Sequence, residues 1–94
     1  MLTPFLMTWI IRRTNQFKKN YQKLPEYLKE KFKVNFQKFL ENQYDISLKT
    51  HKLQWGLEGY LSSGINDDYR FITQIEQTNK IILLINIGNH SIYK

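Results

Sequence analysis

The apolar run at residues 81–87 constrains the fold of this chain most strongly. Six of its seven residues are isoleucine or leucine, and Asn86 is the exception. A run of this length, bounded by turn-forming residues at 77–79 and by Gly88, is typical of a strand that is buried on both faces. We therefore expect a central strand over residues 80–87.

Three further segments have the composition of strands. Residues 9–13 are short and rich in β-forming side chains, and residues 57–65 and 69–77 lie on either side of a turn-like cluster, Asn66-Asp67-Asp68. A second such cluster, at residues 77–79, precedes the apolar run. These turns predict two antiparallel hairpins.

Apolar residues at helical spacing occupy the stretch after the first strand. Thr14 or Asn15 can cap a first helix, and Pro25 ends it and fits the first turn of a second helix at residues 26–42. Residues 44–50 form a connector. We expect the two helices to form a hairpin on the sheet and to bury the following set against it: Phe17, Tyr21, Leu28, Phe32, Phe36, Phe39, Ile72, Ile82 and Leu84.

The expected fold class is therefore α+β in the order β-α-α-β-β-β, with a small twisted, mainly antiparallel sheet packed against an N-terminal helical hairpin. The 94 residues are expected to form a single domain, with residues 1–8 as a loose N-terminal extension. The apolar start is too short for a membrane span, which takes roughly 20 residues. It also lacks the basic lead and cleavage site of a signal peptide, so we expect no membrane association.

Charge is distributed unevenly along the chain. Residues 1–50 contain ten Lys or Arg and four Asp or Glu, whereas residues 51–94 contain four of each. The basic half is suited to a polyanion, either nucleic acid or an acidic protein segment, and it is equally typical of a solubilising surface. The absence of cysteine excludes disulfides and thiolate nucleophiles, and two histidines without a dense carboxylate cluster predict no metal site.

Titratable and aromatic residues gather where the predicted strands begin or end. Asp68, Tyr69 and Arg70 stand at the start of one strand, and His90 and Tyr93 follow the apolar run. The ends of strands are places where a scaffold brings distant side chains together over one ligand. We therefore predict a functional site at this end of the sheet.

Three motifs in the second half of the chain carry a family resemblance. They are His51-Lys52-Leu53-x-x-Gly56-x-x-Gly59, then Ile65-x-x-Asp68-Tyr69-Arg70-x-Ile72, then Ile85-x-Ile87-Gly88-x-His90-x-x-Tyr93. Together with the order of elements, they resemble the RelE/ParE family of toxins from bacterial type II toxin–antitoxin modules. The resemblance extends from about Trp9 to the C-terminus, and the His-Lys-Leu opening and Gly-x-His ending are similar to the branch that cleaves messenger RNA.

The resemblance implies a ribosome-dependent, metal-independent endoribonuclease (an mRNA interferase) that inhibits translation, acts in the cytoplasm without a cofactor and is neutralised by a cognate antitoxin. A ParE-like protein that inhibits DNA gyrase without catalysis is one alternative, and a decayed toxin that only binds its antitoxin is another. Thr73 and Gln74 keep the last alternative open, because many relatives have an aromatic and a basic residue there. Gly64 stands where some ribonuclease relatives have a further histidine.

Metal-free RNA cleavage needs a base, an acid and a cation at the phosphate. The resemblance implies that the guanidinium fork of Arg70 holds the scissile phosphate and that His90 moves a proton. Tyr93 would stack on or orient a base. His51 and Asp68 would lie nearby, either as further groups for proton transfer or, for Asp68, to orient a histidine.

The resemblance also implies RNA contacts at Lys52, through a phosphate, and at Tyr69, through stacking on a base. Each candidate except Tyr93 has a structural alternative. Arg70 is equally suited to an ion pair with Asp68 or Glu76, Asp68 to a turn, and Tyr69 to the core. The two histidines and Lys52 are equally typical of an ordinary surface.

Overall fold

The computed structural model describes residues 9–54 and 59–93. In chain order its elements are β1 (Ile10–Arg13), α1 (Asn15–Gln22), α2 (Glu26–Glu41), the 3-10 helix η1 (Ile46–Leu48), β2 (His51–Lys52), β3 (Tyr60–Gly64), β4 (Arg70–Glu76), β5 (Ile81–Gly88) and the 3-10 helix η2 (His90–Tyr93). The predicted α+β order is confirmed, with β2 as an additional strand. The expected extension at residues 1–8 and the start of the strand predicted at 57–65 lie outside the described residues.

The sheet has the strand order β1-β5-β4-β3-β2 and is mainly antiparallel, as predicted. Only the pair of β1 and β5 is parallel among the described strands. The apolar run thus has a neighbouring strand on each side, but it is not fully buried on both faces as expected. On the face of β5 that meets the helices, Ile82, Leu84 and Ile87 are buried. The other side chains of the run, Ile81, Leu83 and Ile85, are half-buried.

The short strand β2 was not predicted from the sequence. His51 pairs with Ser62 of β3, and Lys52 pairs with Leu61. A strand of two residues is too short to show an alternation of apolar and polar side chains. It forms because these residues pair with β3, and its own sequence does not predict it.

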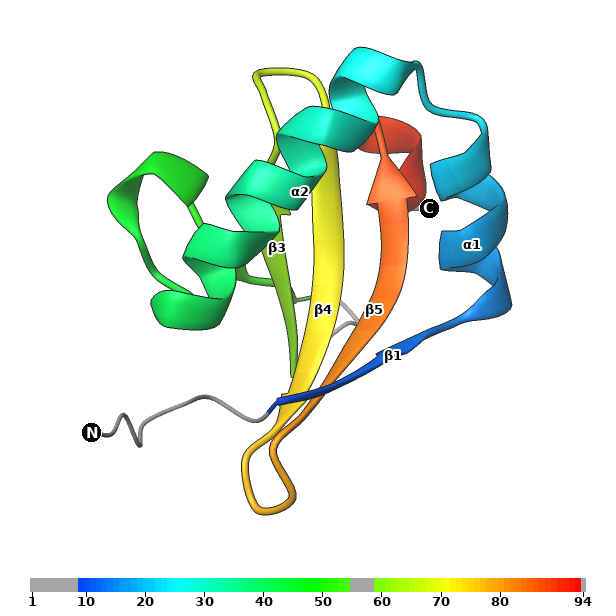
Figure 1. The fold of residues 1–94 in the computed structure, drawn as a ribbon. Coiled ribbons are helices and arrows are strands. Elements are labelled where there is room, and N and C mark those ends of the chain that lie inside the picture. Colours follow the sequence, from blue (N-terminus) through cyan, green and yellow to red (C-terminus); the bar gives the residue numbers. More distant parts are fainter. Residues whose placement is uncertain (1–8, 55–58, 94) are drawn as a thin grey trace, which may run out of the picture.

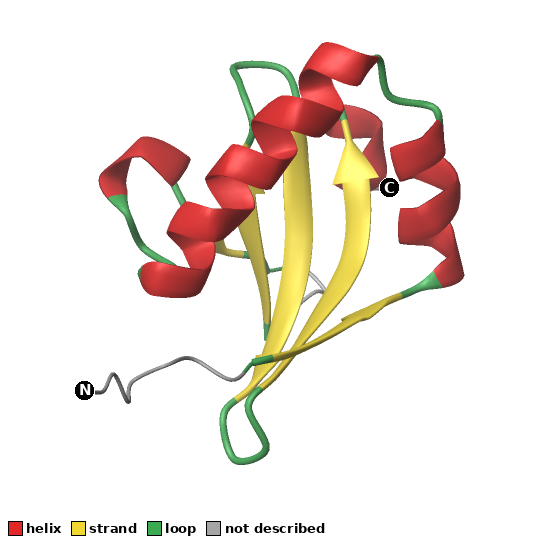
Figure 2. Ribbon diagram, viewed as in Figure 1, coloured by secondary structure: helices red, strands yellow, loops and turns green. Residues whose placement is uncertain are grey.

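Thr14 both caps α1 and joins it to the sheet. Its Oγ1 accepts a hydrogen bond from the amide of Phe17 at 3.0 Å and donates to the carbonyl oxygen of Ile85 at 2.7 Å. After a short turn, Pro25 precedes α2. As a result α2 crosses one face of the sheet while α1 runs beside β5 (Figure 1), which gives a two-layer arrangement of helices and strands (Figure 2).

The core between α2 and the sheet is built around Phe71 of β4. The centroid of its ring lies 5.1 Å from that of Phe32, 5.5 Å from that of Phe39 and 6.1 Å from that of Phe36. The predicted helix residues are buried here, except that Tyr21 and Phe36 are half-buried and pack against the edge of the cluster. The aromatic spacing of the helices therefore marks the core, as predicted.

Ile72 is buried, as predicted, but it lies on the opposite face of the sheet from the helices. Successive side chains of a strand point to opposite faces, and Phe71 occupies the helix face. Ile72 is accordingly absent from the cluster around Phe71, and its cross-strand partner is Ser62. This second face carries the residues of the candidate site.

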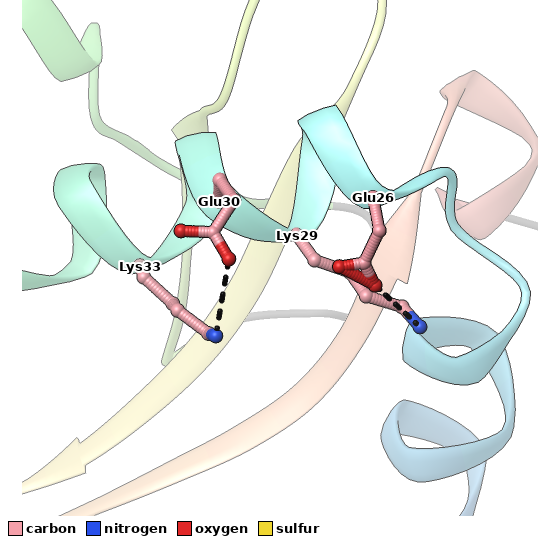
Figure 3. Close-up of polar contacts among 4 residues, drawn as sticks. All are labelled: Glu26, Lys29, Glu30 and Lys33. Atoms are coloured by element: carbon pink, nitrogen blue, oxygen red, sulfur yellow. Dashed lines mark hydrogen bonds and ion pairs between the residues drawn. The ribbon is translucent and has the colours of Figure 1, made fainter.

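Part of the charge on α2 is balanced within the helix (Figure 3). The carboxylate of Glu26 lies 3.7 Å from Lys29 Nζ, and that of Glu30 lies 3.4 Å from Lys33 Nζ. Such exposed pairs stabilise a helix by only about 0.2–0.5 kcal/mol each, so they matter mainly for the surface charge. None of the helices in the described ranges is long and apolar enough to cross a membrane.

Asn35 joins α2 to the end of β3, and its replacement by alanine is expected to destabilise the fold. Its buried Nδ2 donates to the carbonyl oxygens of Gly64 at 2.9 Å and Ile65 at 3.3 Å. Losing these buried bonds should lower the free energy of unfolding by about 1–3 kcal/mol. Urea unfolding measures this, with Gln37→Ala on the exposed side of α2 as the control. Equal stability of the two variants would contradict the assigned role.

Candidate functional site

The guanidinium group of Arg70 is fixed along one edge. Arg70 begins β4 on the face opposite α2, and its Nε donates to Oγ of Ser62 at 2.7 Å. Nη2 donates to the carbonyl oxygen of Ser62 and to that of Lys49, both at 3.0 Å. Arg70 forms neither of the ion pairs considered for it, with Asp68 or with Glu76. In the described ranges the ion pairs join Glu26 to Lys29 and Glu30 to Lys33.

These hydrogen bonds of Arg70 occupy the edge formed by Nε and Nη2, so a phosphate held by this residue would meet the guanidinium group at Nη1. Nη1 makes no hydrogen bond to another described residue. It lies beside Gly64, where an added Cβ would be 3.3 Å from Nη1 and 3.2 Å from the carbonyl oxygen of Leu48. Gly64 thus leaves room for the guanidinium group, and both residues line a cavity of about 110 Å³ together with Lys49 and Asn66.

Tyr93 reaches the same serine from the C-terminal end of the chain. Its hydroxyl lies 2.5 Å from Oγ of Ser62. The chain turns into η2 at Gly88, whose φ of 156° favours glycine and where a Cβ would lie 2.7 Å from Cγ2 of Ile92. Figure 1 shows η2 at the end of β5, behind the sheet as seen from α2. The structure therefore brings Arg70 and Tyr93 together through a shared partner, Ser62, which was not singled out from the sequence.

His51 lies next to Arg70 and Ser62. Its Nδ1 is 3.5 Å from Nη2 of Arg70 and 3.3 Å from the carbonyl oxygen of Lys49, and its cross-strand partner is Ser62. The ring is exposed and accessible to a ligand. We refer to Ser62, Arg70, His51 and Tyr93 as the Ser62 cluster.

His90 and Asp68 lie beside the cluster and not within it. Both residues line an open depression of about 480 Å³, together with Tyr69 and Asn89. The ring of His90 lies 6.3 Å from that of Tyr93, measured between centroids, so the depression adjoins the cluster. His90 is exposed at the start of η2 and makes no hydrogen bond to another described side chain that would fix its ring.

Asp68 and Tyr69 each combine a structural position with an accessible side chain. The amides of both residues donate to Oδ1 of Asn66, at 2.9 Å and 2.8 Å. Asp68 therefore lies in a turn, which is the structural alternative considered for it. Tyr69 is half-buried against the core, and the exposed part of its ring faces the depression. The structure thus accommodates both interpretations of these residues.

Lys52 is separated from the other candidates by the sheet. Its partner Leu61 pairs with Thr73, and both belong to the face that carries α2. Alternation along β2 therefore places Lys52 on the face opposite to His51 and Arg70. An RNA contact by Lys52 would have to lie at the edge of the sheet.

The loop before β2 helps to fix Arg70. Oδ1 of Asp45 accepts hydrogen bonds from the amide of Ser47 at 2.9 Å and from its hydroxyl at 2.6 Å, and these bonds hold the pKa of Asp45 below its ordinary value. Lys49 then adopts a left-handed conformation, with φ of 50°, and its carbonyl oxygen accepts from Arg70. The loop therefore presents a backbone acceptor to the guanidinium group.

The cluster and the adjoining depression combine groups that can bind an anion and transfer protons. They provide free guanidinium hydrogens, two accessible imidazoles, a phenol and a carboxylate. Across residues 9–54 and 59–93, no three or more His, Cys, Asp or Glu side chains are grouped so as to hold a metal ion. Sequence reasoning missed Ser62 and Lys49, and the one available signal was a pair of small polar residues, Ser62 and Ser63, within an otherwise apolar strand.

No protein-family model matches the chain, and no curated protein matches it. Several solved structures are similar. YafQ from E. coli strain BL21(DE3) has a TM-score of 0.76 at 19% identity, over 92% of this chain and 98% of YafQ. A YoeB/ParE toxin from Agrobacterium tumefaciens has a TM-score of 0.76 at 18% identity, over 86% of this chain and 98% of that one. A chain of the toxin–antitoxin complex RelBE2 from Mycobacterium tuberculosis has a TM-score of 0.70 at 16% identity, over 87% and 98%. The chain therefore has the fold of the RelE/ParE-like toxins.

Proposed function

We propose that this chain is the toxin of a type II toxin–antitoxin module and that it cleaves messenger RNA on the ribosome. The observation that supports the proposal most directly is the Ser62 cluster, in which hydrogen bonds hold Arg70 beside a histidine and a tyrosine while its Nη1 bonds to no described residue. The toxin-like fold and the basic first half of the chain support it.

In the proposed reaction the ribose 2′-oxygen attacks the adjacent phosphorus and the bond to the 5′-oxygen breaks. The products are a 2′,3′-cyclic phosphate and a 5′-hydroxyl. Nη1 of Arg70 would donate to the non-bridging oxygens, where negative charge grows in the transition state. Two protons move in this reaction: the 2′-hydroxyl loses one to a base, and the departing 5′-oxygen gains one from an acid. We assign one transfer to His90 and the other to His51, which lies closer to Arg70.

RNA would be positioned by aromatic and basic groups around these residues. Tyr93 borders the reacting phosphate, and the exposed part of Tyr69 can stack on an unpaired base in the depression. Lysines and arginines on β1, α1 and α2 provide a sequence-independent attraction for ribosomal and messenger RNA. Catalysis would then depend mainly on placing the phosphate in line beside Arg70.

The proposed protein partner is a cognate antitoxin. One of the similar structures was solved as a toxin–antitoxin complex. Exposed apolar side chains include Val34 on α2 and Ile46 on η1, and Lys38 of α2 reaches η1 through a hydrogen bond to Ser47 at 3.4 Å. An antitoxin segment with acidic and apolar residues would suit such a surface and could fold as it binds.

Gyrase inhibition remains the second candidate, because one similar structure is named as a YoeB/ParE toxin. A gyrase inhibitor would not need the imidazole of His90 or the free amino group of Arg70. A supercoiling assay with purified DNA gyrase therefore separates the two functions.

The proposed function is tested by adding the purified chain to ribosomes programmed with a defined message and mapping the new 5′ ends. We expect cleavage by the wild type, and His90→Ala should reduce its rate roughly 100-fold, the lower end of the range for acid–base catalysis. Thr78→Ala, in the exposed turn at the other end of the β4–β5 hairpin, serves as the control. Inhibition of gyrase without any cleavage of the message would contradict the proposal.

A further inference from the structure

Ser62 is the only described residue whose side chain forms hydrogen bonds with both Arg70 and Tyr93. It is fully buried, with 0% of its surface exposed. Its Oγ lies 2.7 Å from Nε of Arg70 and 2.5 Å from the hydroxyl of Tyr93, and its carbonyl oxygen accepts from Nη2 of Arg70 at 3.0 Å. One residue thus supplies three of the contacts that fix the two candidate residues.

The hydrogen-bonding capacity of a serine matches these contacts. A hydroxyl has two acceptor sites and one proton, whereas the Nε–H group of arginine can only donate. Oγ therefore accepts from Arg70 and keeps one acceptor site and its proton for Tyr93. The bonds from Nε to Oγ and from Nη2 to the carbonyl oxygen fix the plane of the guanidinium group, which directs Nη1 away from Ser62.

We infer that Ser62 is a positioning residue for the proposed RNA cleavage, which sets the orientation of Arg70 and Tyr93 together. This inference rests on the proposed function. Ser62 itself is too buried to touch the substrate, so it acts through its two partners. Tyr93 depends on it particularly, because η2 is a single short turn that follows a glycine.

A matched control lies next to Ser62 in the sequence. Ser63 is equally buried, but its Oγ lies 2.7 Å from Oγ1 of Thr50 and it belongs to the other face of the sheet. Ser63→Ala therefore removes a buried hydroxyl from the same strand without touching Arg70 or Tyr93. Ser62→Cys is a second test variant, because sulfur fills the site but is a weak acceptor.

The first measurement is single-turnover cleavage on programmed ribosomes, with ribosome binding measured in parallel. We expect Ser62→Ala to lower the cleavage rate at saturating ribosomes roughly 10- to 100-fold, as for the loss of a hydrogen bond to a charged group, and to change binding much less. Ser62→Cys should behave in the same direction, and Ser63→Ala should cleave like the wild type. Wild-type cleavage by Ser62→Ala or Ser62→Cys would overturn the inference.

The second measurement does not depend on activity. Hydrogen exchange at Nε of Arg70, followed by nuclear magnetic resonance, should be slow in the wild type and in Ser63→Ala, and fast in Ser62→Ala. Exchange in the wild type as fast as that of the exposed Arg12 and Arg13 would overturn the positioning role, even if the variants failed to fold. If the wild type cleaves no message but shows slow exchange at Arg70, the proposed function fails while the positioning of Arg70 by Ser62 stands.

Discussion

Replacing Arg70 with alanine is expected to slow message cleavage about 1,000-fold, the upper range for removing a preorganised donor to a developing oxyanion. Nη1 is the donor that remains free when Ser62 and Lys49 occupy the other side of the guanidinium group. Because its bonds would strengthen as charge grows on the phosphate, the loss should fall on the cleavage step and much less on ribosome binding. Single-turnover cleavage and ribosome sedimentation with the same protein separate the two effects.

Two further variants make this test specific. Arg70→Lys keeps the charge but cannot donate at once to Oγ and to the carbonyl oxygen of Ser62 while directing another group outward, so it should restore little of the activity. Arg12→Ala removes an exposed arginine of β1 that would attract RNA only as one charge among many, so it should weaken ribosome binding slightly and leave the cleavage rate at saturating ribosomes unchanged. If Arg70→Ala lost ribosome binding in proportion to its cleavage rate, Arg70 would be a binding residue and not a group that stabilises the transition state.

The fold could be predicted from the sequence wherever apolar residues form a continuous run or recur at the spacing of a helix. The run at 81–87 indicated an interior strand, and the spacing of Phe32, Phe36 and Phe39 indicated the face of α2 that packs on the sheet. The two-residue β2 and the four-residue η2 are too short to show a period, and both depend on contacts made with residues distant in the sequence. The apolar character of Ile72 predicted correctly that it is buried. It did not predict on which face of the sheet the side chain lies, because the face depends on the register of β4.

The candidate site shows the same limit at the level of single residues. Arg70 and Tyr93 were identified by their chemistry at the ends of strands and His51 by the family resemblance, but the residue that joins them was not. Ser62 and Ser63 are identical neighbours, and only the register of β3 decides that the first binds Arg70 and Tyr93 while the second binds Thr50. The orientation of the guanidinium group could not be predicted either, because it depends on a backbone carbonyl oxygen at Lys49 in a distant loop.

Phe71→Ala is expected to have the largest effect on stability. The side chain is fully buried, and its ring lies within 5.1 Å to 6.1 Å of three phenylalanines of α2, measured between centroids. Truncation would remove the contact between sheet and helix and leave a cavity, which costs about 3–5 kcal/mol in comparable cores. Small domains have a total stability of about 5–15 kcal/mol, so a substantial fraction of the molecules should be unfolded near physiological temperature. Urea unfolding of the purified variant measures the loss.

The same substitution also tests how the core supports the site. Phe71 and Arg70 are neighbours on β4 with side chains on opposite faces, so the packing of Phe71 against α2 fixes which face receives the guanidinium group. Phe71→Leu keeps most of the contact and should lose far less stability, and Tyr27→Ala, at an aromatic residue that is 68% exposed on α2, should lose almost none. Equal losses in Phe71→Ala and Tyr27→Ala would contradict the assigned core. In conditions where Phe71→Ala is still folded, it should retain cleavage in proportion to its folded fraction, because Arg70 keeps its own contacts with Ser62.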